Sequence, residues 1–153
     1  MNIYLENDLQ KPKYLFHGSP KKLDKIEQRQ AHDSNGNVVN EDFAVFLTSS
    51  FIMASAYAFK DKIKDLSDGL KWDFDFGYDA DRNELKLVFK NVRIDDELVG
   101  YIYVFPFDES YEHHGRSIQY KSHGDLVPKD CIKIKFSDFK KYYTFTGIVE
   151  EKR

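Results

Sequence analysis

The sequence has one cysteine, four prolines, eight glycines and little charge imbalance, and each scarcity excludes something. Cys131 alone cannot form an internal disulfide or a cysteine-based zinc site. A net charge of −3 and a pI near 5.9 exclude the basic surface typical of nucleic-acid-binding proteins. No apolar run approaches the roughly 20 residues that span a bilayer, and the N-terminus lacks a signal-peptide core. We therefore expect a soluble cytoplasmic protein with no membrane partner.

Aromatic residues are abundant instead, at 16% of 153 residues, with 13 Phe and 10 Tyr. Such side chains fill protein cores, and they also provide flat surfaces for flat ligands. The length fits one core, so residues 1–153 are expected to form a single domain.

The hydrophobic patterns predict an α+β domain with a mostly antiparallel, curved or split sheet, because strands dominate without regular helices between them. Strand patterns cover residues 14–17, 43–48, 71–79, 84–90, 99–105, 117–121 and 131–136. The 25 residues between the first two strand patterns, 18–42, are polar and contain Asn35-Gly36, so we interpret them as a lid or binding loop.

One main helix is predicted at about 50–66, with Ser49 and Ser50 as N-cap candidates and Gly69 as the C′ residue. Its apolar stripe, which is expected to pack on the sheet, consists of Ile52, Ala56, Phe59, Ile63 and Leu66. Tyr57 points about 140° away from that stripe, so we interpret it as lying outside the main core.

Metal binding is not supported by the sequence. The acidic stretch from Asp73 to Glu84 does not place Gly and Glu where a calcium loop needs them. His113, His114 and His123 lack the helical spacing and cysteine partners of a zinc site, so we expect an exposed cluster. Lys140-Lys141-Tyr142-Tyr143 is a short basic and aromatic patch that carries no function alone.

Three segments carry a chemical pattern. His17-Gly18-Ser19 ends the first strand, and glycine there allows a ligand to approach the backbone. Phe46 lies on the next strand and Tyr57 follows eleven residues later on the helix, so the two rings are able to form the walls of a slot. Gln119 is a polar side chain between apolar neighbours in a late strand, where it is able to bind a hydroxyl.

In this order and spacing the segments resemble the ADP-ribosyltransferase fold, in the His-Tyr-Glu branch of diphtheria toxin and the poly(ADP-ribose) polymerases. The resemblance covers residues 14 to about 136 and includes Gln119-Tyr120-x-Ser122. The Arg-Ser-Glu branch fits less well, because His17 stands where that branch has Arg and Lys121 where it ends in Glu.

The resemblance implies an NAD-dependent mono-ADP-ribosyltransferase or NAD-glycohydrolase, with NAD+ as substrate, no metal, and an unknown protein or nucleic-acid acceptor. His17 would bind the nicotinamide-side ribose, Gly18 the carboxamide and Ser19 the other ribose. Phe46 and Tyr57 would enclose the nicotinamide ring. Gln119 would take the catalytic position, and residues 20–42 would cover the adenine end.

The sequence departs from the family pattern at two positions. Phe46 stands where the family usually has tyrosine, and Gln119 stands where it usually has glutamate. Glutamine has neither negative charge nor basicity, so the sequence leaves open a carboxylate from Glu109, Glu112 or Asp125.

Three alternatives remain. The chain could be a catalytically degenerate module that binds a nucleotide or protein, or a globular domain without an NAD site. RNA 2′-phosphotransferase chemistry shares the fold and a similar His-Gly segment, but no arginine flanks His17-Gly18 closely.

Overall fold

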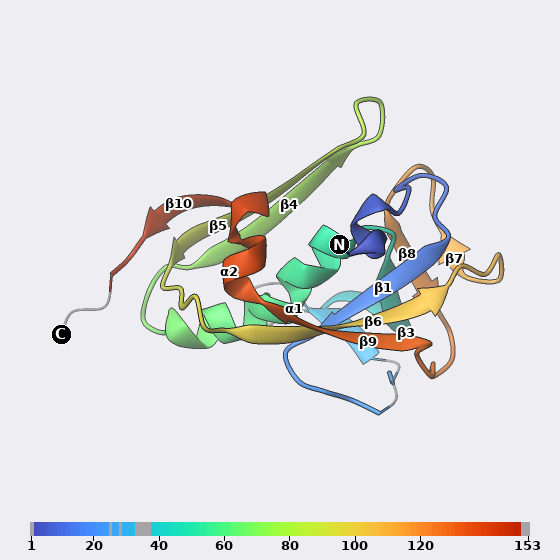
Figure 1. Ribbon diagram of the computed structural model, residues 1–153, viewed down its shortest axis with the longest axis horizontal. Helices are drawn as coiled ribbons and strands as arrows, with labels where there is room; N and C mark the ends of the chain where they lie inside the picture. The colour runs from blue at the N-terminus through green and yellow to red at the C-terminus, as the bar shows by residue number, and fades with distance from the viewer. Residues whose placement is uncertain (1, 25, 28, 33–37, 151–153) are drawn as a thin grey trace.

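The computed structural model describes residues 2–24, 26–27, 29–32 and 38–150, and side chains at 29–32 and 38–43 are not discussed. The fold is α+β, as predicted: strands dominate, and α1 (Phe51–Leu66) is the main helix (Figure 1). The described residues also form a short helix and two 3-10 turns, namely α2 (Phe136–Phe139), η1 (Ile3–Glu6) and η2 (Lys140–Tyr142). No helix in the described ranges has both the length and the apolar character needed to cross a membrane.

The larger sheet has seven described strands in the order β7-β8-β3-β1-β6-β9, with β2 paired to β3, and all its pairs are antiparallel. Its strands are β1 (Tyr14–Ser19), β2 (Arg29–His32), β3 (Val38–Thr48), β6 (Val99–Pro106), β7 (Glu112–His113), β8 (Gln119–Ser122) and β9 (Asp130–Lys135).

A smaller sheet has the order β10-β5-β4, and its strands are β4 (Asp73–Asp79), β5 (Glu84–Val92) and β10 (Thr144–Ile148). β4 and β5 were both predicted as strands and form an antiparallel hairpin, whereas β10 runs parallel to β5. The division into two sheets agrees with the expected split, mostly antiparallel architecture.

Helix α1 begins where predicted, because the Ser50 hydroxyl caps it by accepting the amide N–H of Met53 at 3.0 Å. The helix ends at Leu66 with Ser67 as its C-cap, so Asp68 occupies C′ and Gly69, the predicted C′ residue, lies one position further on. Gly69 has φ +82°, a left-handed conformation that glycine adopts without steric cost.

Helix α1 contacts β1 and β6 of the larger sheet and β5 of the smaller one, so it lies between the sheets (Figure 1). Its closest approach to the larger sheet is made by Ala54 and Ala58, opposite Gly18 and Gly100. These alanines lie roughly 200–240° around the helix from Ile52, well away from the predicted stripe. The expectation of one packing face was therefore wrong, because both sheets bury the helix.

The rings of the core cluster around α1. Phe16, Phe51, Phe59, Phe89 and Phe136 are all almost fully buried. Each such ring stabilises the fold by about 1.5–3 kcal/mol relative to an exposed position. Leu66, the last member of the predicted stripe, is 37% exposed and contributes less.

Two interpretations of surface segments need correction. Residues 18–42 do not form one long loop, because β2 and the first half of β3 form an antiparallel pair within them. Asn35-Gly36 lies outside the described residues. The Lys140–Tyr143 segment is not simply a surface patch, because Tyr143 is buried and its hydroxyl is hydrogen-bonded with that of Ser55.

Candidate functional site

The candidate site lies next to the position where the pairing of β1 with β3 ends. These two strands pair at the single position Phe16↔Thr48, whereas β1 continues along β6 and β3 continues along β8. Beyond that pair, Nδ1 of His17 lies 2.8 Å from the carbonyl oxygen of Phe46. Since a carbonyl only accepts, Nδ1 donates, and in a neutral ring Nε2 then has acceptor character. The imidazole thus connects β1 to β3 beyond the position where their backbone pairing ends.

Gly18 and Ser19 are both buried. A Cβ on Gly18 would lie 1.9 Å from the carbonyl oxygen of Ala54, so the glycine is required by the contact between β1 and α1. The Ser19 hydroxyl donates to the carbonyl oxygen of Lys21 at 2.8 Å. Packing and a local hydrogen bond therefore account for Gly18 and Ser19. The sequence had instead suggested that glycine at this place lets a ligand approach the backbone.

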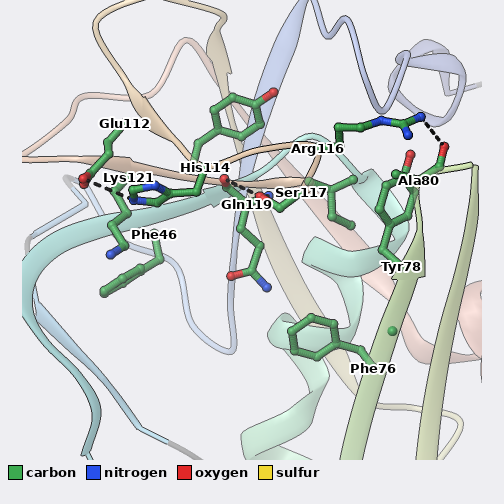
Figure 2. Close-up of a pocket in the computed structure, with 13 residues that line it drawn as sticks. Phe46, Phe76, Tyr78, Ala80, Glu112, His114, Arg116, Ser117, Gln119 and Lys121 are labelled. Atoms are coloured by element: carbon green, nitrogen blue, oxygen red, sulfur yellow. Dashed lines mark hydrogen bonds and ion pairs between the residues drawn. The ribbon is translucent and has the colours of Figure 1, made fainter.

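A cavity of about 790 Å³ lies between β3, β4 and the segment from β7 to β8. Phe46 and Phe76 both line it, and Figure 2 shows the Gln119 side chain extending between the two rings in that view. Phe46 is half-buried and Phe76 is 40% exposed, so both rings present accessible surface to the cavity. The cavity is therefore a groove lined by two aromatic rings and one amide.

Tyr57 contacts the side-chain amide of Gln119. Its side chain is hydrogen-bonded with that of Gln119, and burial raises the pKa of its hydroxyl to about 12. Its ring packs against the edges of Phe74 and Phe76, with centroid separations of 6.4 Å in both cases. Tyr57 is therefore half-buried between α1 and β4, which corrects the interpretation that it lies outside the core.

Charged side chains occupy the β7–β8 side of the cavity. Glu112 pairs in register with Lys121, and Lys121 pairs in register with Phe46. The Nζ atom of Lys121 lies 6.0 Å from the centroid of the Phe46 ring. Nε2 of His123 lies 2.9 Å from one Glu112 oxygen, and Nε2 of His114 lies 3.4 Å from the other. The hydrogen bond from His123 is the main reason why the pKa of Glu112 is lowered.

At one end of the cavity, contacts join its two sides (Figure 2). Arg116 places Nη1 2.6 Å from the Asp81 carboxylate and donates from Nη2 to the carbonyl oxygen of Ala80 at 3.0 Å. Gln10 donates to the same carbonyl at 2.6 Å. These exposed bonds contribute little stability individually, but they join the β4–β5 turn to the loop before β8.

The structure brings together part of the predicted site. Phe46 and Gln119 line one cavity, and Tyr57 binds Gln119. His17 meets this group at the backbone of Phe46, and neither Gly18 nor Ser19 is a lining residue. The three predicted surface histidines are exposed, as expected.

Sequence reasoning missed Phe76, the ring that faces the cavity from β4. The alternation of Phe74, Phe76 and Tyr78 indicated one aromatic face, but only the docking of the second sheet against α1 places that face at the site. Among the described residues, no three His, Cys, Asp or Glu side chains form a group that could hold a metal ion.

Comparison with known proteins adds no relative. No family model, curated protein or solved structure matches this chain. The interpretation of the site therefore rests on the geometry of its own residues.

Proposed function

We propose that the protein binds NAD+ in this cavity and breaks the nicotinamide–ribose bond, passing ADP-ribose to a macromolecular acceptor or to water. The observation that carries this proposal is the cavity that Phe46, Phe76 and Gln119 line together, with two aromatic rings and one amide. A volume of about 790 Å³ lies in the range of cofactor and small-ligand sites.

The groove suits the chemistry of the nicotinamide end. The oxidised nicotinamide ring is flat and cationic, so it is attracted to aromatic faces. A primary amide has two donor hydrogens and one acceptor oxygen, so Gln119 retains hydrogen-bonding capacity for a ribose hydroxyl while it is bound to Tyr57. Cleavage produces a sugar cation like that of glycoside hydrolysis, and a groove that fixes both ring and sugar favours that geometry.

His17 enters the proposal as a positioning residue. Its hydrogen bond to the Phe46 carbonyl holds β3 at the point where the ladder with β1 ends. Without it, the Phe46 ring would lose part of its support. This differs from the direct ribose contact that the family resemblance implies, because the described cavity lining does not include His17.

The test measures binding and cleavage separately. Calorimetry with NAD+ reports binding, and release of labelled nicotinamide reports cleavage, first for the wild type and then for Gln119→Ala and Phe46→Ala. Both variants should weaken NAD+ binding, whereas Tyr142→Ala removes an exposed ring outside this cavity and should leave it unchanged. Wild-type protein that neither binds NAD+ nor releases nicotinamide would show that the proposal is wrong.

A binding module without turnover is the second candidate, and the uncharged Gln119 favours it. An amide positions a sugar but does not offset a developing positive charge. The same two measurements distinguish the candidates, because the module would give a calorimetric signal with NAD+ and no nicotinamide release.

A further inference from the structure

We propose that Glu112 supplies the negative charge that Gln119 lacks and is the catalytic carboxylate of this site. This inference rests on the proposed function and names a residue for its chemical step. The sequence left three candidate carboxylates, and the tertiary structure separates them.

The position of Glu112 follows from strand register. Glu112 on β7 faces Lys121 on β8, and Gln119 lies two residues along β8 on the same face of the sheet. Such diagonal positions lie roughly 7–8 Å apart, which is within reach of two long side chains. Glu112 and Gln119 both line the cavity, and Lys121 connects the row from Glu112 to Phe46.

The other acidic candidates are placed differently. Among the described residues that line the cavity, Glu112 is the acidic one. Glu109 and Asp125 are exposed and do not line it. Asp81 does not line the cavity, and its carboxylate is paired with Arg116.

The surroundings of Glu112 keep it ionised. His123 is hydrogen-bonded to one carboxylate oxygen, and the Nε2 atom of His114 lies near the other. These groups and Lys121 lower the pKa of Glu112, with the His123 bond as the largest cause. A carboxylate of low pKa is a weak base, so its role is to oppose positive charge, and it does not serve as a proton acceptor.

The bond between ribose C1′ and the nicotinamide nitrogen breaks, and its electron pair leaves with a nicotinamide that is now neutral. The positive charge shared by C1′ and the ring oxygen is offset by the Glu112 carboxylate. A water or acceptor oxygen then bonds to C1′ and releases its proton to solvent.

The experiment compares Glu112→Gln with Glu109→Gln, a neighbouring exposed glutamate outside the cavity. Glu112→Gln should lower kcat for nicotinamide release by about 100-fold or more, while the Kd for NAD+ measured by calorimetry stays near the wild-type value. Glu109→Gln should match the wild type in both. Glu112→Ala with added formate provides a second readout, because a small carboxylate diffusing into the space should restore part of the rate.

A wild-type kcat in Glu112→Gln, or no response of Glu112→Ala to formate, would overturn the role of Glu112 while leaving the proposed function standing. A wild-type protein that shows no nicotinamide release would overturn both. Loss of rate with intact NAD+ binding and recovery with formate would support the inference.

Discussion

Replacing Gly18 with alanine tests the central packing contact of the fold. Gly18 lies on β1 directly beneath α1. An alanine Cβ would lie 1.9 Å from the Ala54 carbonyl oxygen and 2.9 Å from the Ala58 nitrogen. Both obstacles are helix backbone, so no side-chain rotation relieves the clash, and α1 must move by more than about 1 Å to reach ordinary contact.

The expected loss of stability follows from that displacement. Overpacking in a filled core costs typically 1–3 kcal/mol, and a clash with backbone between two sheets should reach the upper end, about 3 kcal/mol. For a protein of this size, 1 kcal/mol corresponds to roughly 2–4 °C in Tm, so we expect a decrease of about 6–12 °C.

Differential scanning calorimetry of three glycine variants measures the effect. Gly100→Ala should be milder than Gly18→Ala, because its Cβ would lie 2.8 Å from the Ala58 side chain and meets the helix backbone only at 3.4 Å. Gly77→Ala is the control, since nothing lies within 4 Å of its added Cβ. Alanine in a strand interior is more favourable than glycine by about 0.5–1 kcal/mol, so this variant should be neutral or slightly stabilised. A Gly18→Ala protein that melts with the wild type would refute the described contact between β1 and α1.

Three further predictions concern charged and ionisable side chains at the site and in the core. Gln119→Glu should increase nicotinamide release by about tenfold or more, because it places a charge beside the ribose, and a decreased rate would contradict the assigned position. Unfolding free energy measured in urea should fall as pH rises from 10 to about 12: Tyr57 and Tyr103, whose burial raises both pKa values to about 12, stay neutral in the native state while they ionise in the unfolded chain. A pH-independent free energy across that window would show that these hydroxyls are not shielded. His123→Ala should raise the pKa of Glu112 toward its ordinary value in an NMR titration, and an unchanged pKa would exclude the His123 hydrogen bond as its cause.

Helices and strands whose sequences repeat with a short period were predicted well. The two-residue alternation of 71–79 gave β4, and the Ser50 cap and helical spacing gave α1 within one residue of the expected start. These features depend on neighbours a few residues away, so the chain itself carries the information.

Pairings over long separations were not predicted. The segment Thr144–Ile148 was not among the strand candidates, because its strand forms by pairing in parallel with β5 more than 50 residues earlier. Residues 29–32 were interpreted as loop for the same reason, since their strand depends on pairing with β3.

At the candidate site, the sequence identified Phe46, Tyr57 and Gln119 as residues of interest, and it fixed which of them carry a ring, a hydroxyl or an amide. Only the tertiary structure decided that Tyr57 binds Gln119, that Phe76 forms the opposing ring and that Glu112 shares their cavity. The physical reason is that side-chain chemistry and local periodicity are properties of short segments, whereas a cavity is made by the docking of two sheets on one helix. That docking also gave Gly18 its role, because the space above a glycine is set by whichever element packs there.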